Sequence, residues 1–332
     1  VLIQAGKIAA VGANIVIPKG ATVVDASGKY VLPGIVDAMT YYGIRPYDLN
    51  ETADPVTPQN RAIQGFYPFG ELMRGKPGPI RSKDILDGGV TTIYIAPGDR
   101  QVIGGQGAVV KTAGKDFDSL IVREPAAIDI TLGEPPKQAF RPERRSPATR
   151  MSIAGLLRKA LVSAQEYDRT WSTYQAKSDE EKAKAEKPKR DLGMEALVKL
   201  LRKEIPARMQ ADLVDDIRTA INIAEEFGIE LILDSGVAAY KLKDQLAAKK
   251  IPVVLGPTSH PFVSGGEGFD LDVYRMMDER NAALLTEAGV KIAIASFARG
   301  LGNLTPPITG KWLLVEAALA TAYGLPDEEA LR

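Results

Sequence analysis

Cysteine is absent from the 332 residues, and histidine occurs once, at His260. The absence of cysteine excludes disulfides, thiolate nucleophiles and thiolate metal sites, and it leaves the redox compartment undetermined. Imidazole is the commonest transition-metal ligand in proteins and the usual proton shuttle near neutral pH. A single histidine therefore severely limits both kinds of site.

An excess of either charge is also absent, since Lys+Arg and Asp+Glu both number 42. This balance argues against nucleic acid as a general partner, because phosphate binding requires a basic surface. No apolar run approaches the roughly 18–20 residues of a membrane span. The composition, 45% apolar and 25% charged, is typical of a soluble globular protein, and the length suits one large domain or one large and one small.

The chain begins at Val1, inside a strand-like pattern. Residues 1–12 resemble the second half of a hairpin, with a turn at Gly6-Lys7 and a partner strand before residue 1. At the other end, residues 327–332 begin a helix and stop. We therefore expect a segment of a longer protein, truncated at its C-terminus, in which neither a targeting signal nor a compartment can be seen.

Residues 1–30 are expected to form part of a small β-sandwich domain. Short β segments are predicted at 1–4, 8–11 and 22–25, separated by turns that contain glycine or proline. A ribbon of this kind is only marginally stable alone. The domain is therefore predicted to be incomplete and to take further strands from the missing ends.

Residues 31–147 mix strands with turns and loops. The expected elements are strands at 31–38 and 90–96, β-like runs at 108–112 and 120–122, a short helix at 81–87, and loops at 48–67 and 134–147. Gly104–Gly107 lacks the G-x-G-x-x-G form of a phosphate cradle, and no helix follows it. We therefore predict a tight turn there.

Thr149 is expected to cap a long helix. Apolar residues recur at helical spacing from Ile153 to Tyr174. Residues 176–190 that follow are almost wholly charged or alanine, and several charges form favourable i,i+4 pairs. We interpret 176–190 as a solvated helical excursion; the alternative is a projection that binds a partner.

Beyond residue 204, short apolar strands alternate with amphipathic helices. Strands are predicted at 205–211, 229–234, 251–256 and 290–296, and helices at 214–227, 238–249, 279–288 and 311–323. Gly228 and Gly289 stand where helix-ending glycines belong. The alternation predicts parallel strands inside and helices outside. With similar units upstream, it favours an α/β fold, a (β/α)8 TIM-like barrel over residues 31–332, rather than an open doubly wound sheet.

Functional residues of such barrels lie at the C-terminal ends of the strands. Here those ends carry residues 37–41, 97–100, 210–212, 234–235, 257–260 and 296–299. Their chemistry is mixed, with carboxylates, amides, hydroxyls, the one imidazole and two arginines. We expect these side chains to converge on a single mouth.

The run Leu32-Pro33-Gly34-Ile35-Val36-Asp37 resembles the first-strand signature of the amidohydrolase superfamily. Four later runs are similar to the imidazolonepropionase-like branch of that superfamily, at residues 53–58, 88–92, 102–107 and 149–151. Each run alone is weak, but five in the right order cover most of the chain. The resemblance implies a TIM-like barrel of the metal-dependent hydrolase type, a zinc or iron cofactor, and hydrolysis of carbon–nitrogen bonds other than peptide bonds.

The resemblance also implies where the metal ligands should lie, and other residues stand there. The family's two first-strand histidines, its fifth-strand pair, its sixth-strand histidine and its eighth-strand aspartate correspond to Met39, Tyr41, Gln210, Asp212, Ser235 and Ser296. Some members use a carboxylated lysine, for which Lys111 is the nearest candidate. A hydrolytic zinc or iron needs about three imidazole or carboxylate ligands and an open position. We therefore expect the metal site to be lost.

Two other sites can be considered from the residues alone. Asp37, Asp212 and Asp234 could offer oxygens to Mg²⁺ or Ca²⁺, although hydrogen bonding to loop backbone is the simpler role. His260 could act with Ser259 or Ser235 and Asp234, but no nucleophile elbow or recognised triad is present. His260 and Asp212 are the candidates for any residual catalysis. Residues 262–269, rich in glycine, are predicted to form a flexible loop over the mouth.

Three functions follow from this reading. The first is a catalytically inactive amidohydrolase homologue with a structural, regulatory or ligand-binding role, paired with an active relative or with another part of its own chain in a homo- or hetero-oligomer. The second is a hydrolase of small cyclic amides or peptides with an altered site. The third is a binding module that captures a small molecule without converting it.

Overall fold

A computed structural model describes residues 1–45, 48–68, 82–256, 271–297 and 312–332. The chain divides into two compact units, Val1–Pro33 and Gly34–Arg332. No helix among the described residues has the length and apolar character needed to cross a membrane.

The first unit contains one antiparallel hairpin, formed by β1 (Leu2–Gln4) and β2 (Lys7–Ala10). Its turn lies at Ala5 and Gly6, both with positive φ. β1 and β2 pair with each other, and the further strand expected before residue 1 stays a prediction. The strand predicted at 22–25 is wrong, since these residues pair with no strand in the described part of the chain. The sandwich around this hairpin stays a prediction.

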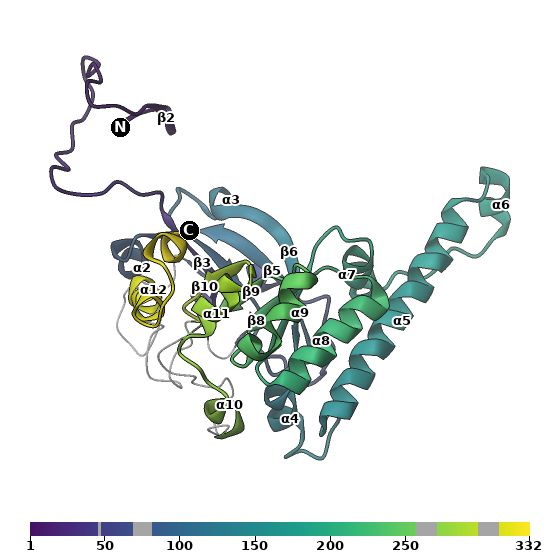
Figure 1. Ribbon diagram of the computed structural model, residues 1–332. Helices are drawn as coiled ribbons and strands as arrows, with labels where there is room; N and C mark the ends of the chain where they lie inside the picture. The colour runs from purple at the N-terminus through teal and green to yellow at the C-terminus, as the bar shows by residue number, and fades with distance from the viewer. Residues whose placement is uncertain (46–47, 69–81, 257–270, 298–311) are drawn as a thin grey trace, which may run out of the picture. The chain divides into compact units, whose positions relative to one another are not determined.

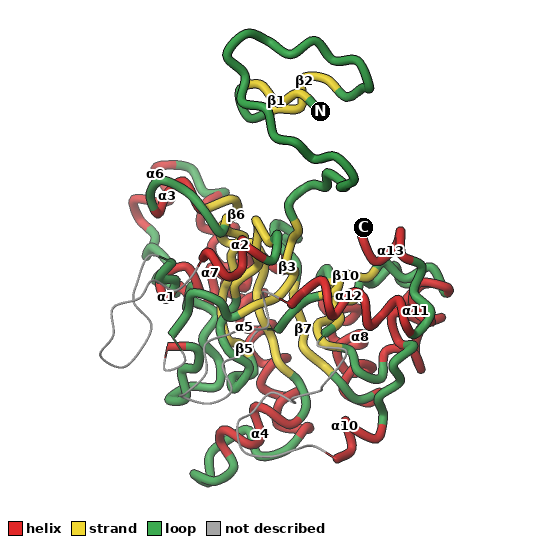
Figure 2. Tube along the Cα trace, turned by 90° about the vertical axis from the view of Figure 1, so that its left-hand side faces the viewer, coloured by secondary structure: helices red, strands yellow, loops and turns green. Residues whose placement is uncertain are grey.

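The second unit is built on an eight-stranded sheet that curves into a nearly closed barrel (Figures 1 and 2). In spatial order its strands are β3 (Ile35–Thr40), β4 (Val90–Ile95), β5 (Ile103–Lys111), β6 (Ile121–Thr131), β7 (Ala207–Ala211), β8 (Leu231–Ser235), β9 (Val253–Leu255) and β10 (Ile292–Ile294). The predicted TIM-like barrel is confirmed. It departs from a regular (β/α)8 pattern at β5, which is antiparallel to both of its neighbours.

Helices of 4 to 26 residues follow many of the strands. In the described residues they are α1 (Ala62–Gly65), α2 (Ser82–Asp87), α3 (Phe117–Leu120), α4 (Glu134–Phe140), α5 (Arg150–Gln175), α6 (Asp179–Lys184), α7 (Leu192–Leu201), α8 (Val214–Phe227), η2 (Ala239–Leu242), α9 (Lys243–Ala248), α10 (Leu271–Arg275), α11 (Asn281–Glu287), α12 (Leu313–Ala322) and α13 (Asp327–Leu331). The predicted ends are confirmed at Thr149, whose Oγ1 accepts the Ser152 amide at 3.1 Å, and at the left-handed Gly228.

The glycine-rich run Gly104–Gly107 lies inside β5, so the predicted tight turn is wrong. Glycine is required there because other groups come very close. A Cβ on Gly105 would lie 2.4 Å from the carbonyl oxygen of Asn60, and one on Gly107 would lie 2.0 Å from the Tyr94 hydroxyl. Glycine in a strand can therefore mark close approach of neighbours rather than a chain reversal.

Two further expectations need correction. The β-like run at 120–122 is only the start of β6, which continues to Thr131 and joins the parallel part of the sheet. The loop predicted at 134–147 contains α4, because Pro135 and Pro136 occupy the first turn of a helix, where a missing N–H costs little.

The charged excursion is confirmed as helical only in part. Helix α6 lies at the end of α5 that is far from the sheet (Figure 1), and it begins with a capping box at Ser178 and Glu181. Residues 185–190 then return without helical structure to α7, which packs on α5. Partner binding by this projection stays a prediction.

The strands bury both of their faces. Outward side chains such as Met209, Leu233 and Val253 join the main core with the apolar faces of α5, α7 and α8. Inward side chains form a separate cluster inside the barrel. The alternation along β7 places Arg208 and Gln210 on the inner face, between outward Ala207, Met209 and Ala211.

Candidate functional site

The parallel strands finish at the end of the barrel near which Figures 1 and 2 place α4 and α10. His260 and Arg299, both assigned to this mouth from the sequence, lie outside the described residues, as does the loop at 262–269. The remaining predicted positions can be located one by one.

Met39 and Tyr41, at the end of β3, are each 3% exposed and pack inside the barrel. They belong to an apolar cluster whose buried members are Met39, Tyr41, Tyr94, Ala96, Ala126, Ala127, Val254, Ala295 and Phe297. The two positions that the sequence resemblance matches to histidines thus contribute to packing.

A buried charge pair inside the barrel was not predicted from the sequence. Arg208 on β7 donates from Nε and Nη2 to the Asp234 carboxylate on β8, with distances of 2.8–3.2 Å. Its Nη1 donates to the carbonyl of Ala38 at 2.7 Å. An arginine at an inward position of a buried strand was the available signal, because a buried guanidinium requires a carboxylate partner.

Tyr94 and Asp129 extend this network to β4 and β6. The Tyr94 hydroxyl donates to Asp129 at 2.7 Å, and the guanidinium of Arg208 stacks 3.9 Å from the centre of the Tyr94 ring. The close approach of Gly107 leaves the room that this tyrosine needs. Four strands therefore share one buried polar network.

Asp37 connects the two edge strands of the sheet. Its Oδ1 accepts the Ser296 amide at 2.9 Å and the Met39 amide at 3.4 Å, while its Oδ2 accepts the Ser296 hydroxyl. Beside it, the Phe297 amide donates to the carbonyl of Met39 at 3.0 Å. The sequence assigned Ser296 to a lost ligand position; the structure adds that it holds the barrel closed.

Burial dominates the electrostatics of this interior. It raises the pKa of Asp37 to about 6, although hydrogen bonds from Ser296 oppose the rise. Burial also raises the pKa of Asp129, Asp234 and Tyr94. Burial alone would lower the pKa of Arg208, but the charge and hydrogen bonds of Asp234, together with Tyr94 and Asp129, outweigh burial and raise the net pKa, so the guanidinium stays charged.

The other predicted positions do not gather around a common point. Ser235 ends β8 with a φ of +70°, while the residue of β8 that holds Arg208 is Asp234. Asp212 lines a cavity of about 10 Å³ with Gly133, room for a single water. Lys111 donates to Thr92 and lies where the parallel strands begin, because β5 is antiparallel.

These residues do not fit a catalytic metal. Among the described residues, no three His, Cys, Asp or Glu side chains are arranged to hold an ion. Asp37 already accepts hydrogen bonds from Ser296, and Asp234 accepts them from Arg208. The charged guanidinium of Arg208 also lies inside the barrel. The methionine and tyrosine at the first-strand positions are poor ligands for zinc or iron.

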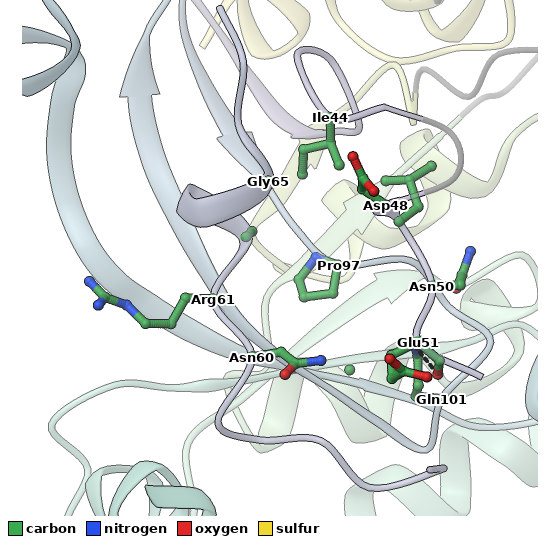
Figure 3. Close-up of a pocket in the computed structure, with 12 residues that line it drawn as sticks. Ile44, Asp48, Asn50, Glu51, Asn60, Arg61, Gly65, Pro97 and Gln101 are labelled. Atoms are coloured by element: carbon green, nitrogen blue, oxygen red, sulfur yellow. Dashed lines mark hydrogen bonds between the residues drawn. The ribbon is translucent and has the colours of Figure 1, made fainter. Parts of the chain in front are cut away.

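A pocket of about 270 Å³ lies beside the mouth (Figure 3). It is formed by the segment after β3, the segment around α1 and the β4–β5 loop, and its lining residues are Ile44, Asp48, Leu49, Asn50, Glu51, Asn60, Arg61, Ala62, Gly65, Pro97, Gln101 and Gly104. Sequence reasoning missed this pocket, because its residues come from loops without a recognisable motif.

The architecture of the second unit defines a TIM-like barrel protein. The crystal structure of an amidohydrolase from Thermotoga maritima MSB8 is similar with a TM-score of 0.83 and 35% sequence identity, over 99% of this chain and 80% of that one. The chain therefore belongs to the amidohydrolases.

A curated relative supports the same family. "Amidohydrolase tasK" of Hapsidospora irregularis is 25% identical over 341 residues, which cover 95% of this chain and 32% of the relative. The chain thus spans about a third of the length of the curated relative it matches. No family model matches the chain.

Proposed function

We propose that this chain is a non-catalytic amidohydrolase of the imidazolonepropionase-like branch. In this proposal the protein keeps the barrel, has lost the metal site, and functions by binding a small molecule or a partner. The resemblance of five sequence runs supports the branch, and the replaced ligand positions support the loss of metal.

The observation that carries the proposal is the packing of Met39 and Tyr41. Both side chains are buried among apolar neighbours, and this packing supports the proposal that they do not serve as metal ligands. The nearby carboxylates of Asp37 and Asp234 are engaged by Ser296 and Arg208. Regaining a metal would require these contacts to break as well as new ligands to appear.

The proposal includes a partner for the barrel, either a second protein or another domain. A non-catalytic barrel can support an active relative or another part of a longer chain, and the match to a relative three times as long is consistent with the second arrangement. The homo- or hetero-oligomer expected from the sequence belongs to this proposal.

Elemental analysis tests the loss of metal. The protein would be purified, incubated separately with Zn²⁺, Fe²⁺ and Mn²⁺, desalted, and measured for bound metal. We expect substoichiometric amounts in every case. One transition metal per chain would overturn the proposal.

Assays with small cyclic amides and dipeptides test the loss of catalysis. We expect no turnover above that of a His260→Ala, Asp212→Ala double variant. Turnover that disappears in the double variant would establish an altered hydrolytic site in place of the proposed function.

A further inference from the structure

We propose that the pocket beside the mouth binds a small ligand that carries ammonium groups. This rests on the proposed function and names the class of molecule that the non-catalytic barrel would capture. The pocket is independent of the lost metal, because none of Met39, Tyr41, Gln210 or Ser296 lines it.

The charge of the pocket wall favours a cation. Asp48 and Glu51 bring two carboxylates to the lining, and neither forms an ion pair with a described residue. Among the described residues of the lining, Arg61 alone is cationic, and its Nε and Nη2 both donate to Glu124, with the Nε distance at 2.7 Å. In Figure 3 its guanidinium extends away from Asp48 and Glu51. The negative charge that faces the pocket is therefore not compensated by this arginine.

A buried polar group in the pocket wall favours a ligand that donates hydrogen bonds. Gln101 is 1% exposed, and its Nε2 donates to the carbonyl of Glu51 at 2.5 Å. Its Oε1 is buried and accepts no hydrogen bond from a described residue. Since a buried carbonyl oxygen without a donor is unfavourable, a ligand whose N–H groups reach this oxygen, which the surrounding wall covers in the empty pocket, gains an acceptor that the described residues leave unused.

Size and apolar lining limit the rest of the ligand. A volume of about 270 Å³ accommodates a molecule of several heavy atoms but not a polymer segment. Ile44, Leu49 and Pro97 supply apolar surface between the polar groups. A short alkyl chain with terminal ammonium groups matches both features.

The test uses three probes of the same length: 1,4-diaminobutane, butane-1,4-diol and succinate. Titration calorimetry and thermal unfolding would be measured at pH 7.5 on the intact chain. We expect 1,4-diaminobutane to bind and to raise the melting temperature by mass action, and the diol and the dianion to do neither. Equal effects of the diamine and the diol would overturn the proposal.

Paired variants separate this pocket from a general attraction of cations. Asp48→Asn with Glu51→Gln removes both charges but keeps the acceptor that Glu51 offers to the Ala53 amide. Asp118→Asn with Glu186→Gln removes two exposed charges elsewhere. We expect at least tenfold weaker diamine binding in the first pair and no change in the second.

The proposed site would be refuted if both double variants bound the diamine with equal affinity while the melting temperature of the first, without ligand, was unchanged. The outcome is distinct from a failure of the proposed function. Bound metal in the same preparation would refute the loss of the metal site whether or not the diamine binds.

Discussion

The Asp37 carboxylate accepts both the backbone amide and the hydroxyl of Ser296, and it does so where β3 and β10, the two edge strands of the sheet, meet. Other neighbouring strands of the sheet are joined by ladders of backbone hydrogen bonds, whereas the Asp37 side chain makes much of the connection here. In this chain a serine stands where the family's ligand aspartate is expected, and the first-strand aspartate has become its partner.

The first prediction concerns the ionisation of Asp37. Its pKa is about 6 in the folded chain and about 3.9 in an unfolded one, so between these values the folded state holds more protons. The contribution of Asp37 to stability is therefore greatest below pH 4 and falls as the pH rises to 6, by about 2–3 kcal/mol. Asp37→Asn should remove this slope, measured as the difference in unfolding free energy from wild type between pH 4 and 7. An unchanged slope would show that another group is responsible.

The second prediction concerns the interior ion pair. Arg208→Met leaves the buried Asp234 carboxylate without its partner and should cost about 3–5 kcal/mol of unfolding free energy. Arg208→Met with Asp234→Leu should cost less than the sum of the single changes, because neither charge is then left alone. Arg202→Met breaks the largely exposed pair with Asp168 and should cost at most about 1 kcal/mol. Urea denaturation measures all four variants, and additive single effects at 208 and 234 would contradict the pair's role.

The third prediction concerns the restoration of the family residue at position 296. Ser296→Asp brings a second carboxylate against Asp37, so one of the two must stay protonated or the seam must open. We expect a loss of about 2–3 kcal/mol at pH 8 and a smaller loss at pH 5. Ser296→Ala removes only the hydroxyl, which favours the ionised form of Asp37, and should cost about 1 kcal/mol at pH 8 and less at pH 5. A stabilised Ser296→Asp variant, or one that binds stoichiometric zinc, would contradict this account.

The fourth prediction concerns Gly107. A methyl group there would overlap the Tyr94 hydroxyl and crowd Asp129, so Gly107→Ala should cost about 1–3 kcal/mol. Removing the hydroxyl with Tyr94→Phe in the same chain should recover part of that loss. Gly155→Ala is the matched control, since nothing lies within 4 Å of its Cβ and alanine favours the interior of α5 by about 1 kcal/mol. Thermal unfolding distinguishes the two sites, and equal effects at both would contradict the role of close approach.

The elements that the sequence predicted well are those with strong periodicity or clear caps. Helix α8 was placed at its observed bounds, because its apolar spacing and Gly228 agree. Strand β5 was divided between a turn and a β-like run, because glycines that permit close approach carry the same local signal as glycines that permit reversal. Which residue an inward side chain contacts depends on the tertiary fold, and no local sequence pattern contains this information.

The candidate site, like the fold, could be predicted only in part from the sequence. Met39, Tyr41 and Ser296 could be singled out as replaced ligands from the resemblance, but their new partners could not. Arg208 and Asp234 lie 26 residues apart and meet only because β7 and β8 pair in register. The pocket around Gln101 depends on loops whose conformations have no sequence signature.

The contact between Asp37 and Ser296 spans 259 residues of sequence. During synthesis, which proceeds from the N-terminus, β3 therefore has to wait for almost the whole chain before its second edge is covered. Until then the growing sheet presents two unpaired edges, the feature by which nascent strands associate wrongly. Barrel closure therefore cannot precede the synthesis of Ser296, and a ribosome-bound chain that ends before this residue leaves both sheet edges uncovered.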